Sequence, residues 1–142
     1  LIEEARVSGA YVGSLAHSIL ATHEPISRPC CLVAGGETTV KVMGGGRGGR
    51  AQEFAVAAAK VVAGLPDVYV AGVGTDGTDG PTDVAGALVD GHTWQRARRL
   101  GIDLNAALRQ NDTYRALKRL GSHIMTGPTG TNVNDLYLLF VL

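Results

Sequence analysis

Residues 44–50 combine five glycines with two arginines, and this composition makes the segment the first candidate for a binding site. It lies between a stretch predicted to be a strand and an alanine-rich stretch predicted to be a helix. Glycine lets backbone N–H groups approach an anion closely, and the start of a helix favours negative charge. Arg47 and Arg50 would add paired donors for a phosphate or a carboxylate. The alternative is a solvated loop whose arginines bind nothing.

The same segment matches two nucleotide-binding motifs only in part. Gly44, Gly46 and Gly49 satisfy G-x-G-x-x-G, but the next predicted strand ends in Gly-Val-Gly rather than in the acidic residue that holds a ribose. A Walker P-loop requires Lys and then Ser or Thr, where this sequence has Arg50 and Ala51. These residues therefore indicate a general anion site at a helix N-terminus.

Three aspartates, Asp76, Asp79 and Asp83, fall within eight residues of a second polar loop. Carboxylates this close repel one another unless a cation lies nearby, and Mg²⁺ prefers oxygen ligands. The spacing does not match an EF-hand. The same aspartates could instead satisfy turn backbone and cap a following helix, and the two roles are compatible.

A third polar loop carries Thr126, Thr129, Thr131, Asn132 and Asp135. These groups could bind phosphates, sugars or small hydroxy acids, or they could brace the loop itself. All three loops follow predicted strands, and ligands of open α/β sheets bind beyond the carboxyl ends of strands. The sequence thus predicts that the three loops converge on one site.

Hydrophobic periodicity and turn residues predict alternating helices and strands around these loops. The predicted helices cover residues 12–20, 51–63, 93–100, 104–110 and 113–120. The predicted strands cover residues 30–34, 38–43, 68–73, 123–125 and 136–142.

The first two of these strands, 30–34 and 38–43, are predicted to pair as a β-hairpin across the glycine pair between them. The other elements alternate, so we expect an α/β fold: a layered, mixed β-sheet with helices on both faces, in three layers. Asp103 and Asp112 are the expected N-caps of the last two helices.

The chain has 142 residues, of which 45% are hydrophobic, and its 13 basic residues balance 13 acidic ones. This composition is typical of a globular domain, and the absence of net charge argues against binding to nucleic acid or a membrane. A small-molecule partner is therefore expected. Cys30 and Cys31 are interpreted as buried small hydrophobic residues in a reducing compartment, which predicts a cytoplasmic protein. No stretch is long enough to cross a bilayer.

Four motifs in order make the sequence resemble a known family. They read Gly-Gly-Glu-Thr-Thr-Val at 35–40, Gly-Arg-Gly-Gly-Arg-Ala-Gln-Glu at 46–53, Gly-Thr-Asp-Gly-Thr-Asp-Gly-Pro-Thr-Asp at 74–83 and Thr-Gly-Pro-Thr-Gly-Thr-Asn-Val-Asn-Asp at 126–135. This combination is similar to the MOFRL domain, the C-terminal part of class II glycerate 2-kinases, which have also been labelled hydroxypyruvate reductases. The resemblance covers residues 30–142, so residues 1–29 are expected to form a linking helix and connector within a larger two-domain chain.

The resemblance implies phosphoryl transfer from ATP to D-glycerate, with Mg²⁺, in a cleft shared with a Rossmann-like N-terminal domain. The isolated fragment is expected to be inactive, and a homodimer is left open. We expect catalytic roles for Arg47, Arg50, Asp76 and Asp79, with the two aspartates as candidate magnesium ligands. The residues expected to bind substrate or nucleotide are Gly36, Glu37, Thr38, Gly46, Gly48, Gly49, Thr75, Thr126, Thr129, Asn132 and Asp135. The family usually has Asn where this chain has Ala51, so any contact from that position is in doubt.

Two other functions remain open. The formal G-x-G-x-x-G would fit an NAD(P)H-dependent hydroxypyruvate reductase. A non-catalytic domain for structure or oligomerisation would use the same loops to brace the fold.

Overall fold

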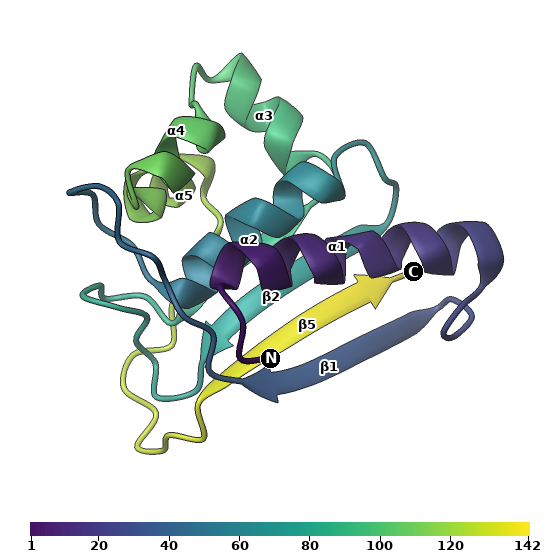
Figure 1. Ribbon diagram of the computed structural model, residues 1–142, viewed down its shortest axis with the longest axis horizontal. Coiled ribbons are helices and arrows are strands. Elements are labelled where there is room, and N and C mark those ends of the chain that lie inside the picture. Colours follow the sequence, from purple (N-terminus) through teal and green to yellow (C-terminus); the bar gives the residue numbers. More distant parts are fainter.

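The computed structural model describes all residues from 1 to 142 and contains one sheet covered by helices (Figure 1). The helices are α1 (Ala5–Thr22), α2 (Arg50–Val61), α3 (Thr93–Arg99), α4 (Leu104–Arg109) and α5 (Thr113–Leu120). The strands are β1 (Cys30–Gly36), β2 (Val68–Gly74), β3 (Gly86–Asp90), β4 (His123–Ile124) and β5 (Asp135–Val141). Every helix predicted from the sequence is present, and the expected α/β class is confirmed.

The sheet has the strand order β1-β5-β2-β3-β4. Every neighbouring pair is antiparallel, so the sheet is not the mixed one that the sequence suggested. Strand β5 pairs with β1 on one edge and with β2 on the other. Its continuous apolar run is therefore that of an interior strand, as predicted.

The predicted β-hairpin is wrong. Strand β1 pairs with β5 instead, and residues 38–43 make only one isolated bridge, from Thr39 to Glu4. Their backbone is held by the start of the chain: the amide of Thr39 donates to the carbonyl of Glu3 at 3.1 Å, and the amide of Ala5, the first residue of α1, donates to the carbonyl of Thr39 at 2.8 Å. Val42 is 77% exposed, so the alternation of apolar residues in this segment does not reflect a half-buried strand.

Helices α1 and α2 cover one face of the sheet (Figure 1). Tyr137 and Leu139 of β5 point toward these helices and are fully buried, whereas Val33 and Leu88 on the other face are 63% and 44% exposed. The chain thus forms two layers, without the second helical layer expected from the sequence. Cys31 also lies exposed, which corrects the expectation that both cysteines are buried; neither forms a disulfide.

Helix α1 approaches α2 closely because it presents two glycines to it. A Cβ atom at Gly9 would overlap the backbone carbonyl oxygen of Phe54, and one at Gly13 would lie 2.9 Å from the Cβ atom of Val61. A backbone oxygen cannot move aside as the end of a side chain can. The helix predicted to be a linker therefore shares a core with the rest of the chain.

Replacing Gly9 by alanine is expected to lower the free energy of unfolding by about 1–3 kcal/mol, because overpacking displaces α1 from α2. This is the net loss expected after the helix-propensity gain of about 1 kcal/mol for alanine over glycine, because the clash is with a backbone oxygen. Ser14→Ala, on the exposed side of the same helix, should change stability by only about 0.5 kcal/mol. Urea unfolding of the intact protein measures both, and equal midpoints for wild type and Gly9→Ala would contradict the packing argument.

The two predicted N-caps behave differently. The side chain of Asp103 accepts a hydrogen bond from the amide of Ala106 and caps α4 as expected. Asp112 precedes α5 but makes no capping bond, and its Oδ1 instead accepts from the amide of Arg47 at 3.2 Å. It therefore fastens the glycine-rich segment to the turn between α4 and α5.

None of the five helices has both the length and the apolar character needed to span a lipid bilayer.

Candidate functional site

A cavity of about 670 Å³ opens at one end of the sheet. Asp135, the first residue of β5, lies opposite Gly36 at the end of β1 and opposite Gly74 at the end of β2. The carboxyl ends of β1 and β2 thus meet the start of β5, and the polar loops leave the sheet from this edge.

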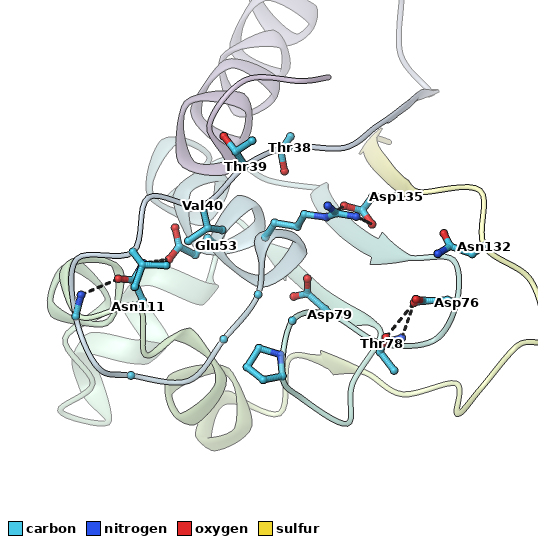
Figure 2. Close-up of a pocket in the computed structure, with 18 residues that line it drawn as sticks. Thr38, Thr39, Val40, Glu53, Asp76, Thr78, Asp79, Asn111, Asn132 and Asp135 are labelled. Carbon is cyan, nitrogen blue, oxygen red and sulfur yellow. Dashed lines mark hydrogen bonds and ion pairs between the residues drawn. The ribbon is translucent and has the colours of Figure 1, made fainter.

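The wall of the cavity consists of polar side chains and glycine, with only two hydrophobic residues, Val40 and Val42, among 18. Figure 2 shows Asn111 and Glu53 on one side of it and Asn132 on the other. The predicted residues that line it are Thr38, Gly46, Gly48, Gly49, Arg50, Asp76, Asp79, Asn132 and Asp135. The predicted residues that lie outside the lining are Gly36, Glu37, Arg47, Thr75, Thr126 and Thr129.

Hydrogen bonds between loops hold the second and third polar loops together. The hydroxyl of Thr75 donates to the carbonyl of Asn134 at 2.7 Å and accepts from the amide of Val133 at 2.8 Å. The amide of Thr129 donates to the carbonyl of Asp76 at 3.3 Å. The structure therefore brings these loops together as predicted, and Thr75 and Thr129 brace them from outside the cavity.

Arg50, at the start of α2, is fixed by two carboxylates. Its Nε donates to Oδ2 of Asp135 at 2.5 Å and its Nη2 to Oδ1 of the same residue at 3.3 Å. Its Nη1 donates to Oε1 of Glu37 at 2.8 Å. Burial alone would lower the pKa of Arg50, but these hydrogen bonds and charges outweigh it and raise the pKa. The guanidinium is thus a permanent cation with a defined orientation.

Arg47 points elsewhere, although it lies only three residues from Arg50. Its guanidinium carbon is 4.5 Å from the ring centroid of Tyr114, a cation–π contact. Its Nε donates to the carbonyl of Pro81 at 3.1 Å. Arg47 therefore ties the glycine-rich segment to α5 and to the aspartate loop on the outside of the cavity.

Asp79 caps helix α2 from a distant part of the sequence. Its Oδ1 accepts from the amide of Ala51 at 3.0 Å, and its Oδ2 accepts from the amide and the side chain of Gln52, both at 2.9 Å. Burial raises the pKa of Asp79, against the opposing effect of these hydrogen bonds. The carboxylate satisfies amides that the first turn of a helix otherwise leaves unpaired.

Tyr137 connects Asp135 to the segment after β1. Its hydroxyl donates to Oδ2 of Asp135 at 3.0 Å and lies 2.8 Å from Oγ1 of Thr38. Burial, together with the nearby charge of Asp135, raises the pKa of Tyr137 to about 12. The neutral phenol is the form that fits this site.

A tyrosine whose pKa is about 12 in the folded state and about 10 when unfolded stabilises the fold fully below pH ~10, and this contribution disappears as the pH rises through 12. We therefore expect the free energy of unfolding of the wild type to fall more steeply between these values than that of Tyr137→Phe. Urea midpoints across this range, with tyrosinate absorbance as a second readout, would show it. Parallel curves for the two proteins would contradict the assignment.

Two further lining residues, Glu53 and Asn111, were not expected from the sequence. Glu53 lies in α2 with only 2% of its surface exposed, and Asn111 lies between α4 and α5 with φ of 53°. One signal was available: a glutamate within an alanine-rich buried helix requires partners, because an unpaired buried charge is costly. Nothing in the spacing indicated that its partner would be Asn111.

These features define an α/β domain with a polar, glycine-walled cleft at one end of its sheet, of a size suited to a small polar ligand. The chain belongs to the MOFRL family, whose family model matches residues 30–135.

Relatives with established names are similar over nearly the whole chain. The D-glycerate 2-kinase of Thermotoga maritima is 47% identical over 135 residues, which are 95% of this chain and 32% of that protein. The glycerate 2-kinase of Pyrococcus horikoshii is 45% identical over 139 residues, which are 97% of this chain and 31% of that protein. The crystal structure of glycerate kinase from Thermotoga maritima matches with a TM-score of 0.98 at 45% identity, covering 100% of this chain and 34% of that chain. The chain thus spans about a third of the length of these relatives.

Proposed function

We propose that this chain is the C-terminal domain of a glycerate 2-kinase and forms one wall of the cleft where a phosphoryl group passes from ATP to D-glycerate. The observation that carries the proposal is the polar cavity around Arg50, in a chain whose whole fold matches 34% of a glycerate kinase. Phosphoryl transfer depends on positioning and charge stabilisation more than on a protein nucleophile. The cavity suits this chemistry, since its lining combines an oriented guanidinium with carboxylates and glycine backbone.

Arg50 is proposed to bind the carboxylate of glycerate or the transferred phosphoryl group. Its guanidinium has five N–H donors and directs three of them at Asp135 and Glu37, which leaves two for a ligand. The two carboxylates set the orientation of the guanidinium before a ligand arrives. Such preorganisation is what stabilisation of a developing charge requires.

The charge balance of the cavity implies that this wall does not act alone. Arg50 is the only cationic side chain in the lining, beside the carboxyl groups of Glu53, Asp76, Asp79 and Asp135. Two anionic substrates would need further positive charge, from Mg²⁺ and from the Rossmann-like N-terminal domain that the family resemblance implies. The proposal therefore assigns activity to the complete polypeptide and expects the isolated chain to be inactive.

Asp76 fits a magnesium ligand better than Asp79 does. Oδ1 of Asp76 accepts from the amide and the hydroxyl of Thr78 at 2.9 and 3.1 Å, and its Oδ2 makes no hydrogen bond within the chain. Both oxygens of Asp79 are already held by α2. The chain has no group of three or more acidic, histidine or cysteine side chains that could hold a metal ion. Mg²⁺, however, commonly binds one or two carboxylates plus substrate phosphates. When bound, it would neutralise charge on the phosphoryl oxygens.

A coupled ADP-release assay on the intact protein, meaning the complete polypeptide that contains this chain, tests the proposal. We expect ADP formation that requires D-glycerate and falls sharply with related hydroxy acids. Consumption of reduced nicotinamide with hydroxypyruvate, measured in parallel, should be absent. Reductase activity without ADP formation would overturn the proposal in favour of the hydroxypyruvate reductase. A folded protein that shows neither activity would favour a non-catalytic domain.

A further inference from the structure

The side chain of Asn111 makes four hydrogen bonds to residues that line or adjoin the cavity. Its Oδ1 accepts from the amides of Met43 and Gly44 at 2.7 and 2.9 Å. Its Nδ2 donates to the carbonyl of Lys41 at 3.2 Å and to Oε1 of Glu53 at 2.6 Å. Both donors and both acceptor positions of the amide are thus used, in the only orientation that matches every partner.

Asn111 is itself held in place by its burial, its backbone conformation and a contact with Glu53 of α2. Its side chain is nearly buried, with the residue 7% exposed, and its backbone adopts a left-handed conformation that asparagine tolerates better than most residues. Glu53, which accepts a hydrogen bond from Nδ2 of Asn111, also accepts one from Nη2 of Arg6 at 3.0 Å. The same Nη2 donates to the carbonyl of Leu108 at 3.3 Å. A polar network therefore links α1 and α2 to the turn that carries Asn111, and Figure 2 shows its contact between Glu53 and Asn111.

Asn111 provides all the side-chain hydrogen bonds to the segment it holds, and the other contact there is with backbone: Gly44 packs closely against the backbone of Gln110, to whose carbonyl the amide of Gly46 donates at 2.9 Å. In residues 41–44, the amides of Met43 and Gly44 find no other acceptor, and Val42 and Met43 are 77% and 52% exposed. This segment lacks strand pairing and apolar anchoring, yet Val42 and Gly44 line the cavity. Within residues 41–44, the side-chain hydrogen bonds that fix the conformation therefore all come from Asn111.

We propose that Asn111 is a positioning residue that preforms the wall of the substrate cavity at residues 41–44. This inference rests on the proposed function, because it assigns the segment a part in substrate binding. Without the anchor, the segment samples other conformations, and the apparent affinity falls in proportion to the competent fraction. Saturating substrate restores the competent form, so the loss belongs in KM and not in kcat.

The clean variant is Asn111→Gly, because glycine keeps the left-handed backbone without strain and removes only the side chain. In the intact protein we expect KM for D-glycerate or for ATP to rise about tenfold, with kcat changed less than about threefold. Asp67→Gly is the matched control: it also replaces a residue with positive φ, of 54°, at the far end of β2 from the cavity. The control should leave both KM values unchanged. Both KM values within twofold of wild type for Asn111→Gly, or a fall confined to kcat, would overturn the proposal.

A paired exchange separates positioning from general stability. Asn111→Asp keeps an acceptor for the amides of Met43 and Gly44, but it sets a carboxylate oxygen against both Glu53 and the carbonyl of Lys41, so KM should rise above that of the wild type. Adding Glu53→Gln restores a donor–acceptor pair at position 53 with its direction reversed but leaves the lost bond to Lys41, so KM should fall part of the way back toward the wild-type value. A double variant no better than Asn111→Asp would show that the contact with Glu53 does not hold Asn111, contrary to the proposal.

Hydrogen exchange provides a readout that needs no activity. Peptides covering residues 41–46 should exchange faster in Asn111→Gly than in wild type or Asp67→Gly, while peptides from β5 remain unchanged. If the wild type forms no ADP, the proposed function fails, and this comparison still decides whether Asn111 anchors the segment. Unaltered exchange in residues 41–46 would refute the anchoring itself.

Discussion

Replacing Arg50 by alanine in the intact protein is expected to lower kcat/KM for glycerate phosphorylation by about 100-fold or more, the loss typical of a preorganised charged donor at a transition state. The guanidinium is oriented by Asp135 and Glu37, and no other cationic side chain lines the cavity. Arg50→Lys should recover only part of the activity, because a lysine keeps the charge but loses the paired geometry. The coupled ADP-release assay measures each variant.

Arg47→Ala is the natural comparison, since it removes the same type of residue from the same segment. Its guanidinium packs on Tyr114 outside the cavity, so the loss in kcat/KM should be less than about tenfold. Equal losses for Arg47→Ala and Arg50→Ala would mean that the two residues act through the fold of the loop. Activity of Arg50→Ala within a fewfold of wild type would remove Arg50 from the mechanism.

Asp79→Ala is expected to give the largest loss of stability, about 2–4 kcal/mol, because hydrogen bonds to a charged group contribute about 1.5–3 kcal/mol each. Three donors at the start of α2 would lose their acceptor. Relief of the burial that raises the pKa of Asp79 offsets part of this loss. Urea unfolding of the intact protein gives the magnitude, and hydrogen exchange of the first turn of α2 locates it.

Asp83→Ala serves as the control from the same loop. Asp83 is exposed and accepts one hydrogen bond, from the hydroxyl of Tyr114 at 2.7 Å. Because this contact is exposed to solvent, its loss should leave the urea midpoint close to that of the wild type. If Asp79→Ala proved as mild as Asp83→Ala while abolishing ADP formation, Asp79 would be a catalytic residue and not the cap of α2.

The helices could be predicted because each is marked by local signals. In α5, for example, helix-forming residues run to Leu120, and Gly121 then ends the helix with φ of 66°. The strand pairing could not be predicted, because β1 pairs with a strand at the opposite end of the chain. The glycine pair at 35–36 resembled a hairpin turn, but both glycines belong to β1 and pair with β5. Strand β3 was missed because its five residues begin with glycine and alanine, which have weak β propensity.

The place of the candidate site could be predicted from the sequence, but the direction of its side chains could not. Polar loops after apolar strands indicated which edge of the sheet they would share. A loop side chain, however, points wherever its partners lie, and those partners are distant in sequence. Arg47 and Arg50 show this, since one packs on Tyr114 and the other pairs with Asp135. Asn111 carried no signal at all, because its role depends on contacts with residues far along the chain.

The most direct test of the central claim is a crystal structure of the intact protein with D-glycerate and a non-hydrolysable ATP analogue. We expect ligand in the cavity bounded by the three polar loops, with a carboxylate or phosphate oxygen hydrogen-bonded to the guanidinium of Arg50. Both ligands bound elsewhere in the protein, with neither touching Arg50 nor the loops around it, would contradict the account.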